Sequence, residues 1–241
     1  MNKIIQILTI AVLMISIMEP AFAGPGGKIA SAILHTFWGK VLLFILFLLF
    51  FPLILYILVR EYLAERRTLQ DLRELAKFNN LFDWLILRER ITDCFYRIHR
   101  AWRKEDMSEA SEWTTDWYWK NQQLVYLDQW TKNGLINHCR VKKIRGIKPL
   151  FLAYRGNEKV ADGSRLVVSI IAKMEDYLAK RDTGEVVEGA KGFQEVETIW
   201  TFSVKNGQWV VANIEEDMLS LDYAQLANEL PGYLMNSEKV F

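Results

Sequence analysis

The sequence lacks the residue clusters from which metal sites, disulfide frameworks and most enzyme active sites are built. Its two cysteines, Cys94 and Cys139, are not in CxxC spacing, so a single bridge between them and two free thiols in a reducing compartment are both open. The sequence contains no metal-ligand spacing, phosphate-binding loop or nucleophile motif. We therefore expect a protein with no metal, no cofactor and no catalytic residues.

The sequence also lacks an excess of charge of either sign. Its 30 basic and 29 acidic side chains give a net charge of +1. We expect no nucleic-acid partner, because such binding usually needs a strong positive field. The exception is the basic stretch 140–148, which fits a contact with anionic lipid headgroups, a contact with RNA, or a solvated strand edge whose lysines discourage aggregation. The candidate anionic-lipid contacts are Arg140, Lys142, Lys143, Arg145 and Lys148.

The start of the chain is predicted to be a secretory signal peptide, residues 1–23. It has Lys3, then an apolar stretch, then a small-x-small cleavage site at 21–23. The alternative is an uncleaved first membrane helix. A short Gly-rich spacer is expected at 24–39.

Residues 40–60 are predicted to form a transmembrane helix. The 19 residues between Lys40 and Arg60 are uncharged. At a rise of about 1.5 Å per residue they come close to spanning a hydrocarbon layer of ~30 Å. Basic residues are denser after this segment than before it, so the positive-inside rule places the C-terminal domain in the cytoplasm, with or without signal cleavage.

Residues 61–81 are predicted to form a charged juxtamembrane helix. Leu69, Leu72 and Ala76 recur at helical spacing within a segment of alternating charge. A solvated stalk that continues the membrane helix is favoured over an interfacial helix whose thin apolar stripe lies on headgroups.

The remainder divides into a helical half and a strand half, followed by a tail at 219–241. Helices are predicted at 82–104, at a short segment opened by the capping-box sequence 106–109, and at about 115–132. Strands are predicted at 150–154, 165–179, 193–205 and 208–214. About three helices packed on a curved antiparallel sheet of about four strands give an α+β domain at 82–218.

The last hairpin, which turns at Asn206-Gly207, is predicted to have an apolar inner face. The predicted cross-strand pairs are Val204 with Trp209, Phe202 with Val211, and Trp200 with Asn213. Most of this face is expected to be core, and a ligand hollow would open at the Trp200/Asn213 end. The candidate hollow residues are Trp102, Trp200, Phe202, Trp209 and Asn213.

His99 and Asp176 are the candidate acid and base groups of an enzymatic alternative. We expect His99 to be a satisfied or exposed histidine, because it lies beside the central apolar stripe of its helix. Asp176 and Tyr177 are adjacent in a predicted strand, so their side chains should point to opposite faces. We therefore expect no enzyme.

Three motifs, in order along the chain, resemble the Tim44-like domain family. They are RITDCFYRIHRAWRKED (90–106), DTGEVVEG (182–189) and ETIWTFSVKNGQWVVANIEE (197–216). The family pattern has an Ala-Trp pair soon followed by Asp, a Thr-Gly…Gly turn, and Glu-x-x-Trp-x-Phe before a hairpin ending in Gly-x-Trp. The chain departs from it at His99, which stands where Gln is usual, and at Glu216, which stands near another frequent Gln.

The resemblance implies an NTF2-like cone with an apolar hollow between sheet and helices. It also implies non-enzymatic scaffolding at the bacterial inner membrane, with a protein partner, anionic lipid or both, in protein translocation or membrane-protein assembly. The rival hypotheses are a structural subunit of a secretion apparatus, whose domain lies outside the inner membrane, and a small-molecule enzyme that uses the hollow.

Overall fold

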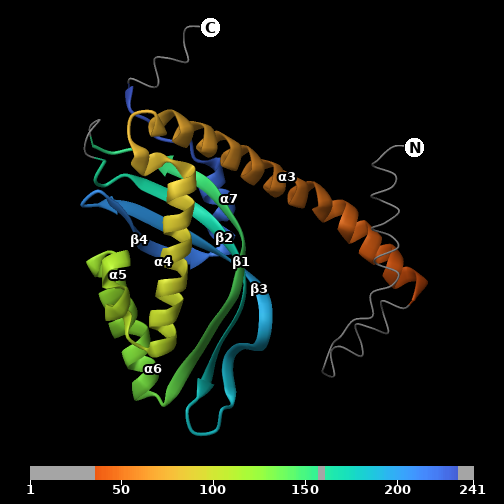
Figure 1. Cartoon of the computed structure of the whole chain (residues 1–241). Coiled ribbons are helices and arrows are strands. Elements are labelled where there is room, and N and C mark those ends of the chain that lie inside the picture. The colour runs from red at the N-terminus through yellow and green to blue at the C-terminus, as the bar shows by residue number, and fades with distance from the viewer. Residues whose placement is uncertain (1–35, 157–160, 233–241) are drawn as a thin grey trace. The chain divides into compact units, whose positions relative to one another are not determined.

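The computed structural model describes residues 36–156 and 161–232, and the chain divides into two units, Met1–Val59 and Arg60–Phe241. The predicted signal peptide and most of the predicted spacer lie outside the described residues. Helix α3 (Phe37–Ala76) begins in the first unit and ends in the second (Figure 1).

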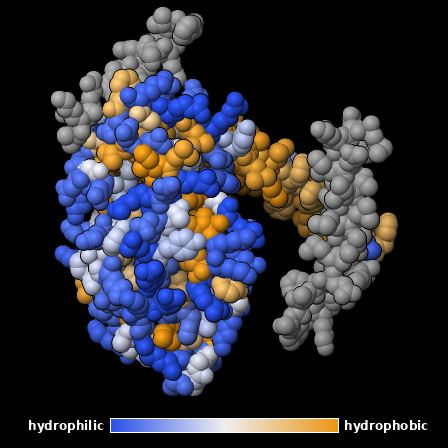
Figure 2. All heavy atoms as spheres, in the orientation of Figure 1, coloured by the Kyte–Doolittle hydropathy of each residue, from blue (hydrophilic) through white to orange (hydrophobic). Residues whose placement is uncertain are grey.

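The first unit contains the predicted transmembrane segment. Among the described residues, α3 is the one helix that is long and apolar enough to cross a membrane, and 0% of its apolar window is buried. Its first part appears as a nearly continuous apolar surface in Figure 2. Pro52 lies inside the helix, which is tolerated in lipid.

The second unit begins with the last part of α3, which packs on the domain. Ala64, Thr68, Leu72 and Leu75 follow one helical face and are each 1% exposed or less. Farther along the chain, Asn228 ties this helix to the sheet: its Nδ2 donates to Asp71 Oδ2 (2.6 Å) and its Oδ1 accepts from the backbone N–H of Leu152 (2.9 Å). The prediction of a solvated stalk is therefore wrong for this part of the helix.

The sheet has four antiparallel strands in the order β1-β2-β3-β4. They are β1 (Leu135–Ala153), β2 (Arg165–Lys180), β3 (Val186–Lys205) and β4 (Gln208–Glu216). Bulges interrupt the pairing of β1 with β2 at three places, and bulges increase the twist and bend of a strand. The predicted strand at 150–154 is only the end of β1.

Helices cover the two faces of this sheet unequally (Figure 1). The main core lies under α4 (Trp84–Lys104) and includes Phe95, Trp200 and Phe202. On the other face, Tyr223 of α7 (Ser220–Gln225) packs against a smaller apolar cluster. The remaining elements are η1 (Asn80–Phe82), η2 (Met107–Trp113), α5 (Asp116–Gln122), the π-helical turn η3 (Gln123–Leu127), α6 (Asp128–Lys132) and η4 (Asp217–Leu219).

Local signals explain where the covering helices begin and end. Asp83 caps α4, because its carboxylate accepts from the backbone N–H of Leu85 (2.8 Å). Glu105 ends α4 in a left-handed conformation, and the guanidinium of Arg181 donates to its carboxylate (2.6 Å). The predicted α+β fold of the NTF2-like cone type is confirmed.

Candidate functional site

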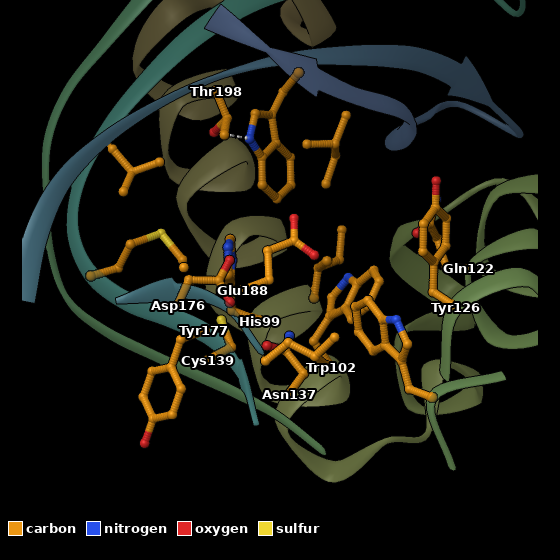
Figure 3. A pocket seen from close by; sticks show the side chains of 18 of the residues that line it. His99, Trp102, Gln122, Tyr126, Asn137, Cys139, Asp176, Tyr177, Glu188 and Thr198 are labelled. Atoms are coloured by element: carbon orange, nitrogen blue, oxygen red, sulfur yellow. Dashed lines mark hydrogen bonds between the residues drawn. The ribbon is translucent and has the colours of Figure 1, made fainter. Parts of the chain in front are cut away.

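A hollow of about 370 Å³ lies between α4, the α5–α6 segment and the inner face of the sheet (Figure 3). This volume is within the usual range for pockets that bind small ligands. The lining comes from every one of these elements, so it depends on the whole fold. Its polar members are His99, Gln122, Asn137, Asp176, Glu188 and Thr198, and its aromatic members are Trp102, Tyr118, Tyr126, Trp130, Tyr177 and Trp200.

Trp200 of β3 forms a rigid wall of the hollow. Its side chain is fully buried, and its Nε1–H donates to Thr198 Oγ1 at 2.8 Å. Its ring centroid lies 5.0 Å from that of Phe95 and 5.7 Å from that of His99. These contacts fix the indole in one position.

Trp102, Tyr126 and Trp130 form a second aromatic wall. Their ring centroids lie 5.6–6.1 Å apart at interplanar angles of 45–63°. Tyr126 belongs to the π-helical turn η3, and single π-helical turns are often found at functional sites. The side chain of Gln123 holds this turn, because its Oε1 accepts from Met107 N (2.9 Å) and its Nε2 donates to Asp128 Oδ1 (2.8 Å).

Asp176 and Glu188 give the hollow its charge (Figure 3). Burial among neighbouring atoms raises the pKa of Asp176, the Glu188 charge raises it further, and a hydrogen bond from Asn137 opposes both. Gly189 brings the two strands together: a Cβ there would lie 2.6 Å from the carbonyl oxygen of Asp176. The site therefore holds two carboxylates on adjoining strands.

His99 faces the same hollow as a neutral ring. Its Nδ1 lies 2.7 Å from Phe95 O and must donate, because a carbonyl oxygen only accepts. Burial lowers the pKa of His99 to about 4, against a weaker raising effect of that hydrogen bond. The prediction of a satisfied histidine is confirmed, and at neutral pH its Nε2 is an acceptor.

Cys139 and Cys94 are free and buried thiols. Burial is the main cause that raises the pKa of each, to about 12 for Cys94. The charge of Asp176 raises that of Cys139 further. Both thiols are therefore protonated and weakly nucleophilic. Within 36–156 and 161–232, no group of three or more His, Cys, Asp or Glu side chains could hold a metal ion.

The predicted hollow residues do not all meet at this site. Trp102 and Trp200 line it, whereas Phe202, Trp209 and Asn213 do not. Phe202 is fully buried in the core, and Trp209 packs at the far end of α4, where its Nε1–H donates to Leu81 O (2.7 Å).

The predicted pairing of Trp200 with Asn213 is wrong. A bulge between Thr201 and Phe202 places Ala212 out of register, so Trp200 pairs with Ile214 and Asn213 pairs with Thr201. The predicted pairs Val204–Trp209 and Phe202–Val211 are confirmed, because they lie between the bulge and the turn. The polar exception on the inner face therefore disappears.

Sequence reasoning gave little weight to the polar residues of the hollow. Asp176 shares the parity of Met174 and Leu178 along β2, and both neighbours line the hollow. Tyr177 also borders it, but its ring stacks on His138 with centroids 4.7 Å apart. Asp176 is the acid–base candidate of the sequence analysis, and strand parity supports its place in the hollow, whereas Glu188 lies before a turn-like glycine and has no comparable signal.

The basic stretch lies on β1, at an edge of the sheet, and most of its charges have partners. Ion pairs join Arg140 to Glu175 (2.8 Å), Arg145 to Glu195 (3.8 Å) and Lys148 to Glu61 (3.7 Å). Lys142 lies over the ring of Phe193 (5.5 Å), and Lys143 is exposed. The five candidate lipid contacts therefore form a partly neutralised edge.

A family comparison decides where this chain belongs. The model of the Tim44-like domain matches residues 69–216, which is more than half of the chain. The chain belongs to the Tim44-like family. The match begins inside the predicted juxtamembrane helix, at the turn of α3 that includes the buried Leu72.

Two solved structures share remote similarity with this Tim44-like chain. The intermembrane space region of the chloroplast protein ARC6 is 8% identical, with a TM-score of 0.37 over 52% of this chain and 92% of that one. AclR from Streptomyces galilaeus, provisionally assigned as a hydroxylase, is 13% identical, with a TM-score of 0.24 over 62% and 93%. No curated protein matches.

The three sequence motifs of the Tim44-like domain meet at the hollow. The first contributes His99 and Trp102 from α4, the second contributes Glu188 and Gly189, and the third contributes Trp200 with its partner Thr198. These segments are far apart in the sequence. Their convergence marks the hollow as the feature that the motifs build.

Proposed function

We propose that this Tim44-like protein is a non-enzymatic, membrane-tethered binding module that holds part of a partner in its hollow. The observation that carries the proposal is the convergence of all three family motifs on one cavity. Its rigid aromatic walls and its size suit a ligand group or an inserted side chain. The partner is a protein held in the hollow, an anionic lipid held at the β1 edge, or both, and the process is protein translocation or membrane-protein assembly.

The hollow is a better candidate for the main contact than the β1 edge. Arg140, Arg145 and Lys148 are already paired with carboxylates, so they have less charge to offer a headgroup. Lys142 and Lys143 are the members of that edge that we retain for a lipid contact. Tethering raises the local concentration of the domain at a bilayer surface, which makes a weak lipid contact useful.

Site-specific photocrosslinking tests the proposal in the full chain in native membranes. A crosslinking residue replaces Gln122, which lines the hollow, and a matched one replaces Lys173, which does not. A defined adduct from position 122 and none from position 173 supports the proposal. Equal labelling at both positions, or none at 122, contradicts it.

We propose that the domain lies on the cytoplasmic side of a bacterial inner membrane, anchored by one helix after signal cleavage. The denser basic residues after the apolar segment support this orientation. A reporter phosphatase that works only in the periplasm, fused after Phe241, should be inactive. An active fusion instead supports the rival function, a subunit of a secretion apparatus whose domain lies outside the inner membrane. Such a subunit should also co-purify as part of a large stoichiometric complex.

A small-molecule enzyme is the second candidate, because His99 and Asp176 line the same hollow. The chemistry of the site supports it less well. A pKa of about 4 makes His99 a weak base at neutral pH, and the Cys139 thiol stays protonated. Replacing both His99 and Asp176 by Ala and keeping the cellular phenotype counts against the enzyme.

A further inference from the structure

The hollow carries negative charge without a basic side chain in its lining. Asp176 and Glu188 are its two charged members at neutral pH, and neither has an ion pair within the part of the chain that the structure describes. Basic side chains lie beside the hollow but not in its lining: Arg103 influences Cys139, and Lys191 lies over the ring of Tyr177 (5.9 Å). Two carboxylates without an ion pair, both exposed to solvent in the lining of the hollow, attract a cation from outside.

The uncharged polar groups of the hollow do not supply that cation. His99 is neutral, and its free Nε2 accepts rather than donates. Asn137 is only 9% exposed, and its hydrogen bond to Asp176 is not strong enough to offset the effect of burial on that carboxyl. An occupant with N–H donors can therefore bond to groups from β2, β3 and α4.

The aromatic walls favour the same kind of occupant. The electron-rich faces of Trp and Tyr rings attract cations, and they also bury apolar carbon atoms. Trp102, Tyr126 and Trp130 form one such wall, and Trp200 forms another. A cavity lined by both carboxylates and aromatic rings suits a molecule with one charged and one apolar end (Figure 3).

We propose that the hollow binds an organic cation, a primary ammonium or guanidinium group on an apolar stem, with Asp176 and Glu188 holding the charged end and the Trp102–Tyr126–Trp130 wall holding the stem. A metal ion is disfavoured, because the described residues contain no group that could complete its coordination. The inference rests on the proposed binding function and specifies what the hollow accepts. The cation comes from a free amine or from a Lys or Arg side chain of a partner protein.

Isothermal titration calorimetry tests this with the full chain in nanodiscs of neutral phosphatidylcholine, with empty nanodiscs subtracted to remove partitioning. The probes are phenethylamine, phenethyl alcohol and hydrocinnamate, which differ mainly in the charge at one end. We expect the amine to bind at least about tenfold more tightly than the alcohol, and hydrocinnamate to show no binding. N-acetyl-lysine amide is the protein-like probe: its binding assigns the site to a partner's side chain, and binding of phenethylamine alone assigns it to a free amine.

Two charge-neutralising variants locate the site. Asp176→Asn and Glu188→Gln should each weaken amine binding about tenfold, without a matching effect on the alcohol. Glu175→Gln is the matched control, because Glu175 precedes Asp176 in β2 but pairs with Arg140 outside the hollow. Near-ultraviolet circular dichroism checks that each variant keeps its tertiary packing.

Equal binding of amine and alcohol, or equal loss of amine binding in Glu175→Gln and Asp176→Asn, overturns the cation proposal. That outcome leaves the binding function intact if position 122 still forms its specific adduct in membranes. Conversely, failure of position 122 to form that adduct, while the hollow still binds the amine, overturns the proposal of a protein partner. The hollow is then a site for a small-molecule cation.

Discussion

His99→Gln should remove a large part of the protein's sensitivity to acid. Burial holds the pKa of His99 at about 4 in the folded state, against an ordinary value of 6.5. The unfolded chain therefore takes up a proton as pH falls through 6.5, and the folded chain does so only near 4. Stability contributed by the neutral ring is complete above pH 6.5 and is lost progressively down to pH 4.

The size of the effect follows from the two pKa values. Within this window, stability falls by about 1.4 kcal/mol for each pH unit, to a total on the order of 3 kcal/mol. The variant also loses ring contacts, because the imidazole lies 4.1 Å from Phe95 and 5.7 Å from Trp200, centroid to centroid. That loss is the same at every pH, so only the pH-dependent difference between the two proteins reports the histidine.

Chemical unfolding of the full chain in detergent micelles, followed by tryptophan fluorescence at several pH values between 7.5 and 4.5, measures this difference. Eight of the nine Trp residues lie after position 60, so the signal reports on the folded domain. His138→Gln controls for the loss of an exposed imidazole. Parallel pH curves for the wild type and His99→Gln would show that the surroundings of His99 do not hold its ring neutral.

Three further predictions concern the fold around the hollow. Leu72→Ala should lower the free energy of unfolding by about 2–5 kcal/mol, because it leaves a cavity where α3 packs on the domain. The control Leu63→Ala changes an exposed side chain and should lower it by less than about 0.5 kcal/mol. Denaturant titration measures both, and equal effects would contradict the docking of α3. Asp176→Asn should raise Tm only slightly at pH 7, because the fold disfavours the charged form, as the raised pKa of Asp176 indicates, but solvent at this exposed side chain screens the effect. The gain should vanish below about pH 3.8, where the unfolded chain also protonates, and a lowered Tm at pH 7 would contradict this. Gly189→Ala should lower Tm more than Gly184→Ala. Both glycines have positive φ, but only at Gly189 would the new Cβ also collide with backbone atoms. Equal Tm values for the two variants would refute the close approach of β2 and β3.

The sequence predicted the parts of the fold whose signals are local. The helix at 82–104, the turn at 181–185 and the Asn206-Gly207 hairpin all lie within a residue or two of their predicted places. A capping carboxylate, a turn glycine and a periodic apolar stripe each act over a few residues. These signals are therefore readable without knowledge of the rest of the chain.

The first strand was missed over most of its length because its pattern is dominated by charge. Lys142, Lys143 and Arg145 point away from the core, and Gly146 and Pro149 interrupt the alternation. Their edge position and the three bulges make this composition compatible with a strand. Only pairing with β2 reveals it.

The juxtamembrane helix shows the same limit for packing. Leu72 and Leu75 give a thin apolar stripe that suits a stalk, a membrane-surface helix or a docked helix equally well. The deciding partner is Asn228, more than 150 residues later, within a segment that the sequence marked only as tail. A single sequence cannot show which distant segment satisfies a polar side chain.

The same two carboxylates, Asp176 and Glu188, affect both the stability of the fold and the binding of a cation in the hollow. Gly189 allows β3 to approach the carbonyl of Asp176 closely, and this approach puts Glu188 near the Asp176 carboxyl. Two like charges on adjoining strands, both exposed to solvent, reduce stability slightly unless a cation joins them. Occupation of the hollow by a cation should therefore raise Tm more in the wild type than in Asp176→Asn, because the bound charge relieves a repulsion that the variant no longer has. Thermal scans of both proteins with and without phenethylamine measure this, and an equal rise in both would indicate that the ligand binds away from the two carboxylates.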